Sequence, residues 1–105
     1  MLIELPDDLI YAVDFRYAKT DVSTLTYCNI FCYSPETKEY KYYASGAAKQ
    51  NKKDIFNKGF GRRLALKRAL SSSGFNKEDK KLIWQKYFSL MDKKLYRKEF
   101  SKEVV

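Results

Sequence analysis

The sequence has 105 residues and carries 21 Lys and Arg against 13 Asp and Glu, which gives a formal net charge of +8, and it has no histidine. A chain of this length is expected to form a single domain, residues 1–105, with a modest core. Its hydrophobic content of 45% is typical of a globular protein. No stretch predicts a transmembrane segment or a signal peptide, so we expect a cytoplasmic protein.

Catalysis is not expected from this composition. General acid–base chemistry needs a group that titrates near neutral pH, and histidine is absent. The carboxylates are scattered, and the sequence contains neither a phosphate-binding P-loop nor a dinucleotide-binding motif. We therefore expect no enzyme, with no catalytic residues, no cofactor and no metal ion, and a function in binding.

The charge is unevenly distributed along the chain. Residues 1–48 hold four basic and seven acidic residues, a net charge of −3, whereas residues 49–105 hold seventeen and six, a net charge of +11. A basic half indicates a polyanionic partner, usually nucleic acid. The alternative is that lysine abundance reflects the base composition of the genome and a solvated surface.

The first half is expected to form strands. Apolar and polar residues alternate along 9–18 and 23–33, a period of two that is typical of strands. The tyrosine-rich segment 39–44 returns after a turn at 34–38, where Pro35 supplies the fixed φ. Short turns between sequential strands predict a three-stranded antiparallel β-meander over 9–48, preceded by a short lead at 1–8.

The two cysteines share one face of the second expected strand. At strand rise, Cys28 and Cys32 lie roughly 13 Å apart, too far for a disulfide or a shared metal ion. We expect both to be small buried side chains in a reducing compartment. The tyrosines of the sheet are expected to pack along it. Stacking on nucleic-acid bases and a homodimer interface are the alternatives for an exposed tyrosine face.

A central helix is predicted over 51–73. Asn51 suits the N-cap position with Asp54 three residues later, and Asn57 is an alternative start. After the serines at 71–73, Gly74 suits the left-handed position that follows a helix.

Small residues and cations occupy different sides of this helix. Gly61, Ala65 and Ala69 recur every four residues and are expected to form the line along which the helix lies on the sheet. Glycines near the first turn indicate close packing or, alternatively, a phosphate near backbone N–H groups. Arg63 and Lys67 are expected to be solvated. The candidate residues for binding nucleic acid or a partner are Lys52, Lys53, Lys58, Arg62, Arg63, Lys67 and Arg68.

A C-terminal helical region is predicted over 76–100. Asn76 can cap its start, and Ile83, Trp84, Tyr87 and Phe88 belong to a wide apolar face that is expected to pack in the core. The tail beyond residue 92 either extends this helix, forms a short third one or stays mobile. The expected fold class is α+β, with the two or three helices on one face of the meander.

The segments Phe56–Leu70 and Asn76–Phe88 resemble a pattern found in small accessory proteins of bacteriophages and other mobile elements. The resemblance consists of a Gly-Arg pair, a repeated Ala-Leu and a Trp-x-x-Tyr-Phe sequence in the second segment. It implies a mobile-element protein that acts in the cytosol of a bacterial host. It brings no catalytic or binding residues with it.

Three functions compete on this basis, and the first is favoured over the other two. The first is an inhibitor of a host defence complex, anti-CRISPR-like, whose basic surface contacts a host protein or a nucleoprotein such as a CRISPR–Cas effector. The second is a small basic DNA-binding protein, either a regulator or a recombination accessory. The third is a partner-binding module whose charge is incidental. None of them involves a membrane.

Overall fold

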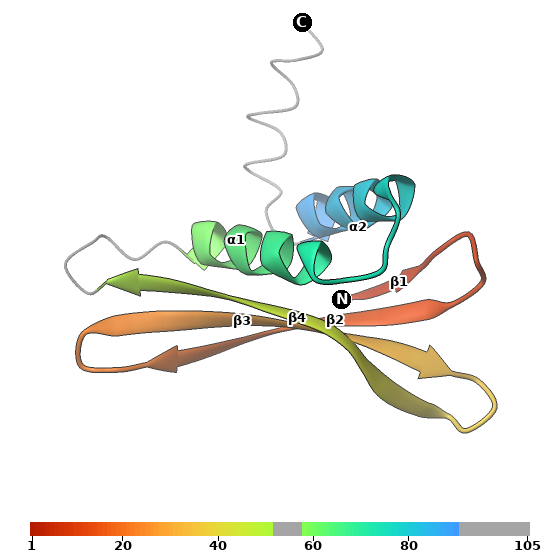
Figure 1. Ribbon diagram of the computed structural model, residues 1–105, viewed down its shortest axis with the longest axis horizontal. Helices are drawn as coiled ribbons and strands as arrows, with labels where there is room; N and C mark the ends of the chain where they lie inside the picture. Colours follow the sequence, from red (N-terminus) through yellow and green to blue (C-terminus); the bar gives the residue numbers. More distant parts are fainter. Residues whose placement is uncertain (52–57, 91–105) are drawn as a thin grey trace, which may run out of the picture.

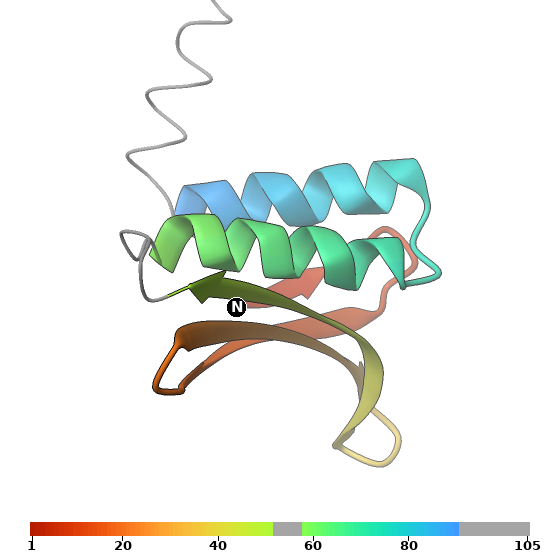
Figure 2. The same ribbon diagram turned by 60° about the vertical axis from the view of Figure 1, so that its left-hand side comes forward.

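In the computed structural model, which describes residues 1–51 and 58–90, an antiparallel sheet of four strands carries two helices on one face (Figures 1 and 2). The sheet order follows the chain, and its strands are β1 (Leu2–Glu4), β2 (Ile10–Lys19), β3 (Ser23–Ser34) and β4 (Glu39–Asn51). The helices are α1 (Lys58–Ser71) and α2 (Lys77–Leu90). The predicted α+β class is confirmed, with four strands in place of three.

The additional strand is β1, where the sequence predicted only a lead. Its three residues are too few to show a recognisable alternation. The segment becomes a strand because it pairs with β2, and this contact is not visible in the sequence. The terminal amine of Met1 donates to the Val13 carbonyl over 3.0 Å, and the Val13 N–H donates to the Met1 carbonyl over 2.8 Å. The turn between the two strands holds Asp8 at a φ of 64°, a left-handed conformation that Asp tolerates better than most residues.

The third predicted strand was too short, and the predicted start of the central helix at Asn51 was wrong. β4 continues through Asn51, which pairs with Ser23. Ala48 and Gln50 are buried, as inward-facing strand positions should be. The helix begins at Lys58, the position that the alternative start at Asn57 predicted; Asn57 and Asp54 themselves lie outside the described residues. Small residues at 44–48 concealed the strand because they lack a strong apolar alternation.

The left-handed conformation predicted for Gly74 is also wrong. No glycine in the described ranges has a positive φ. Serine hydroxyls instead donate to the last carbonyls of α1: Ser72 to Ala69 over 3.0 Å, and Ser73 to Leu70 over 2.6 Å. A helix end with several serines can therefore satisfy its carbonyls without a left-handed residue.

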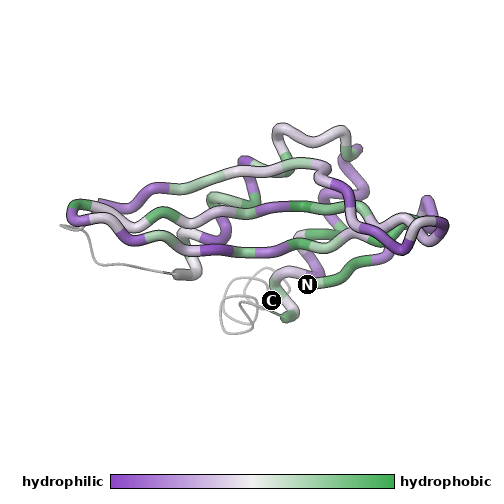
Figure 3. The backbone as a smooth tube through the Cα atoms, turned by 90° about the horizontal axis from the view of Figure 1, so that it is seen from below, coloured by the Kyte–Doolittle hydropathy of each residue, from purple (hydrophilic) through white to green (hydrophobic). Residues whose placement is uncertain are grey.

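The face of the sheet under the helices forms the core. Val13, Cys28 and Ile30 are buried there. The predicted burial is confirmed for Cys28, whereas Cys32 is only half-buried. Seen from below the sheet, hydrophilic and hydrophobic residues alternate along the strands (Figure 3). A register shift beside Ile30 and Phe31 interrupts this alternation in β4. Tyr43 lies opposite the shift and packs against Phe75, with ring centroids 4.7 Å apart.

Helix α1 lies directly on β4 along the predicted row of small residues. Ala65 and Ala69 are fully buried. A Cβ atom on Gly46 would clash with the backbone of Ala65 and Ala69 and would lie 2.8 Å from the Arg68 carbonyl carbon, so only glycine allows this approach. Gly61 approaches Thr26 and Gln50 in the same way, since a Cβ there would lie 2.6 Å from Thr26 Oγ1. The packing explanation for Gly61 is thus confirmed.

Helix α2 covers the other side of the same sheet face. Asn76 caps it as predicted, because its side-chain oxygen accepts from the Asp79 N–H over 2.8 Å. Ile83 and Tyr87 are fully buried, and the ring of Tyr87 lies 5.8 Å from that of Phe15 on β2. The predicted helical region beyond Leu90 lies outside the described residues.

Candidate nucleic-acid interface

The two layers of the protein differ in charge. Residues 58–90, which form the helices and their connection, carry nine Lys or Arg and two acidic residues, whereas residues 1–51 carry five and seven. Helix α1 has no acidic residue at all, and α2 has both of its acids in the first turn. Within the described residues, the excess positive charge is therefore carried by the helices, which lie side by side on one face of the sheet (Figure 2).

The middle of α1 offers the candidate cations that sequence reasoning placed on its outer side. Lys67 is exposed, as predicted. Arg63 is half-buried, although the prediction had it solvated. A lysine on the exposed side of a helix keeps its ammonium group hydrated and can exchange that hydration for a phosphate contact.

Two of the candidate arginines make hydrogen bonds within the fold. Arg62 donates from Nε to the Tyr87 hydroxyl over 3.4 Å and from Nη1 to the Tyr17 hydroxyl over 3.2 Å, so it joins α1 to α2 and β2. Arg68 donates from Nη1 to the Ala47 carbonyl over 2.6 Å. These bonds give both arginines a positioning role in the fold in addition to their charge.

The remaining candidates are at the start of α1. Lys52 and Lys53 lie outside the described residues, and Lys58 is the first residue of α1 with an undescribed side chain. The described candidates Arg62, Arg63, Lys67 and Arg68 therefore lie on one helix but do not form one cluster. Arg62 reaches toward α2 and β2, whereas Arg68 reaches toward β4.

The cations of α2 were not among the predicted site residues. Lys77, Lys81 and Lys86 are exposed, and Lys80 is half-buried. Their sequence positions were evident, but the placement of α2 beside α1, which gives the helix layer a second basic helix, follows only from the tertiary structure (Figure 2).

The described residues include no group of three or more His, Cys, Asp or Glu side chains arranged to hold a metal ion. Both cysteines are free thiols. Burial raises the pKa of Cys28 to about 12, and the charge of Asp14 adds to this effect. Cys28 is therefore a neutral, unreactive core side chain at physiological pH.

The chain matches no family model, no curated protein and no solved structure. The resemblance to phage accessory proteins thus stays a prediction. Among the residues described, no helix has the length and apolar character needed to cross a membrane.

Proposed function

We propose that this chain is a non-enzymatic binding protein that contacts nucleic acid through the exposed cations of α1 and α2. The observation that carries the proposal is the separation of charge between the layers, with nine basic and two acidic residues in 58–90. Phosphate contacts supply most of the affinity of sequence-independent nucleic-acid binding, and they require cations gathered on one side of a protein.

The close packing of α1 on β4 supports a binding surface made of cations on the outer side of this helix. Because the small row Gly61, Ala65 and Ala69 holds the inner side of α1 on β4, the cations of its outer side stand on a rigid element. A polyanion that binds there meets cations whose helix is already fixed in place, which lowers the entropy lost on binding.

The test is a charge reversal on each helix. We expect Lys67→Glu and Lys81→Glu each to weaken binding to a generic DNA duplex by about tenfold at low salt, because each change removes one phosphate contact and adds a repulsion. Fluorescence anisotropy of a labelled duplex measures the effect. Both side chains are exposed, so folding should be retained.

A matched control is Lys49→Glu. Lys49 is exposed and pairs with Leu25 on the sheet, and it carries the same charge change away from the helices. We expect the duplex affinity of this variant to stay within about threefold of the wild-type value, because salt screens the long-range repulsion between the new carboxylate and the duplex. Equal losses for Lys49→Glu and Lys67→Glu would contradict a helix-borne interface.

A second candidate function is inhibition of a host defence nucleoprotein, as the first sequence hypothesis stated. The sheet face opposite the helices favours it, because Tyr40 is 49% exposed and Tyr42 is 66% exposed there. Exposed tyrosines are frequent at protein interfaces. One molecule could then contact nucleic acid with its helices and protein with its sheet.

This second function predicts tighter binding to a purified, guide-loaded CRISPR–Cas effector than to free duplex. We expect Tyr42→Ser to weaken binding to the effector and to leave duplex binding unchanged. Surface plasmon resonance with both ligands decides between the two functions. Equal affinity of the wild type for effector and duplex would contradict the second one.

A further inference from the structure

The outer edge of β1 presents backbone groups that no strand in the described part of the chain pairs with. Met1 and Val13 exchange two hydrogen bonds, so the next hydrogen-bonded pair along this antiparallel ladder is Ile3 with Tyr11. The N–H and C=O groups of Leu2 and Glu4 therefore point away from β2. Since β1 is the first strand of the sheet order, they lie on its open edge.

The other edge strand of the sheet, β4, has contacts that β1 lacks among the described residues. On β4 the Ser45 carbonyl accepts a hydrogen bond from Ser72 Oγ, whose single proton it shares with the Ala69 carbonyl, and the Ala47 carbonyl accepts one from the Arg68 guanidinium. Side chains from α1 and from the residue that follows it thus cover the β4 backbone at these two positions. Exposed edges are normally blocked in this way, and an edge that is left open can pair with another strand.

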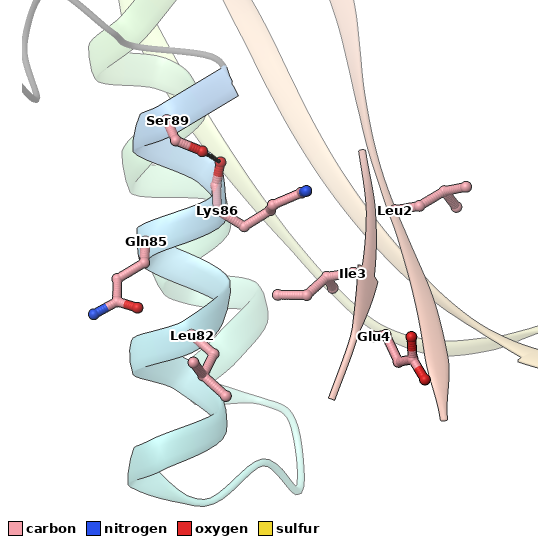
Figure 4. Close-up of a pocket in the computed structure, with 7 residues that line it drawn as sticks. All are labelled: Leu2, Ile3, Glu4, Leu82, Gln85, Lys86 and Ser89. Carbon is pink, nitrogen blue, oxygen red and sulfur yellow. Dashed lines mark hydrogen bonds between the residues drawn. The ribbon is translucent and has the colours of Figure 1, made fainter. Parts of the chain in front are cut away.

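A groove of about 480 Å³ runs beside the open edge, between β1 and α2. In Figure 4, Ile3 points from β1 toward α2, and Lys86 extends from α2 toward β1, whereas Leu2 and Glu4 point away from the helix. Leu82 of α2 also lines the groove and is 36% exposed. The remaining lining residues are Gln85 and Ser89.

We propose that this groove binds an extended peptide segment of a partner protein, which adds a fifth strand to the sheet at β1. The backbone of that segment would bond to the outward N–H and C=O groups of Leu2 and Glu4. The side chain opposite Ile3 would then enter the groove toward Leu82, because side chains that face each other across a sheet lie on the same side. Strand addition at an exposed edge is a common mode of peptide recognition.

The charge of the groove specifies the chemistry of the segment. Lys86 is a cation beside the apolar lining, and Glu4 points to the opposite face of the sheet. The fitting segment carries an aliphatic residue opposite Ile3 and a carboxylate two residues away on the same side, within reach of Lys86. A second copy of this chain is a poorer occupant, because symmetric pairing of two β1 strands would place two Lys86 ammonium groups in one shared groove.

The experiment is a selection from a displayed library of random decapeptides against the full chain, followed by measurement of one selected peptide in synthetic form. We expect enriched peptides with an aliphatic residue and an Asp or Glu two positions apart, without proline between them. In amide hydrogen exchange, the N–H groups of Leu2 and Glu4 should become protected when the peptide binds, since strand addition gives them acceptors.

Two variants with the same charge change separate this site from the proposed nucleic-acid interface. Lys86→Glu should weaken the selected peptide by about tenfold, and a selection repeated on it should enrich Lys or Arg at the acidic position. Lys81→Glu, on the same helix but outside the groove lining, should leave peptide affinity within about twofold while it weakens duplex binding. Failure of duplex binding with intact peptide binding would therefore count against the proposed function alone.

Three results would overturn the proposal. The first is a selection with no enrichment, and the second is an enriched peptide that binds wild type and Lys86→Glu equally. The third is a dimer in sedimentation equilibrium whose formation protects Leu2 and Glu4, because the occupant of the edge would then be a second copy.

Discussion

The two sides of α1 differ in almost every physical property, although they belong to one helix of 14 residues. The inner side consists of Gly61, Ala65 and Ala69, which are buried against the sheet. The outer side carries Lys67 and the half-buried Arg63. The inner side has side chains small enough for backbone contact, and the outer side has long charged ones.

This difference separates stability from binding. A change on the inner side alters the packing between layers and should affect the free energy of unfolding. A change at an exposed cation should affect affinity for a polyanion with little effect on folding, since exposed substitutions usually alter stability by less than about 0.5 kcal/mol. Substitutions on and opposite the two sides of α1 therefore test whether the two sides behave this differently.

The largest expected effect is at the β4 residue that faces the inner side. Gly46→Ala should lower the free energy of unfolding by about 3 kcal/mol, because the new methyl group clashes with the backbone of α1, which cannot move without losing its packing. Urea denaturation measures the loss. Gly74→Ala is the control, because its Cβ would meet only the Tyr43 hydroxyl at 3.1 Å, and we expect a change within about 1 kcal/mol.

The next largest expected effect is a loss of stability when Arg62 on α1 is replaced, compared with the replacement of Lys67 on the same helix. Arg62→Ala should cost about 1–2 kcal/mol of stability, because Arg62 donates to the hydroxyls of Tyr17 and the fully buried Tyr87. Lys67→Ala removes the same charge and should cost less than about 0.5 kcal/mol. Thermal unfolding of both variants makes the comparison, and equal costs would show that the two positions are not distinguished by the fold.

A buried hydroxyl on β3, opposite the inner side of α1, predicts a gain in stability. Thr26 is fully buried beneath Gly61, and its Oγ1 has no hydrogen-bond partner among the described residues. Because an unsatisfied buried hydroxyl is costly, Thr26→Val should raise the free energy of unfolding by about 1 kcal/mol. Chemical denaturation of the two proteins decides the sign, and a loss of stability would indicate that the hydroxyl is satisfied in solution.

No effect is expected from the core thiol until the pH becomes alkaline. The pKa of Cys28 is raised from 9.0 to about 12 in the folded state by burial. The neutral thiol therefore contributes fully to stability below pH 9, and this contribution is lost as the pH rises from 9 toward 12. Stability measured from pH 7 to 10 should be flat and then fall, and Cys28→Ala should reduce the fall.

Much of the fold could be predicted from the sequence because its signals are local. Alternation predicted the strands β2 and β3 and divided their residues between two faces, and the four-residue spacing of Gly61, Ala65 and Ala69 predicted the contact side of α1. β1 could not be predicted, since its pairing is set by β2. The extension of β4 past Ala44 was hidden for a similar reason, because Gly46 in this extension is required by the approach of α1.

The candidate site was predictable only in part. The charges of α1 are evident from the sequence, but the bonds of Arg62 to two tyrosines depend on tertiary contacts. The groove beside β1 was not predicted from the sequence. It is formed by β1 and α2 together, and the sequence does not show that these two elements are neighbours. Sequence patterns identify surfaces within one element better than surfaces shared between elements.

The most direct test of the account is a salt titration of duplex binding by the wild-type protein between about 50 and 200 mM salt. If the cations of α1 and α2 contact phosphates, the affinity should fall by about 60-fold over this range, which corresponds to a log–log slope near −3 and about three or four phosphate contacts. Lys67→Ala should make the slope shallower by about one contact. Absence of binding at the low-salt end, or an affinity that does not change with salt, would contradict the proposal that the basic helix layer binds nucleic acid.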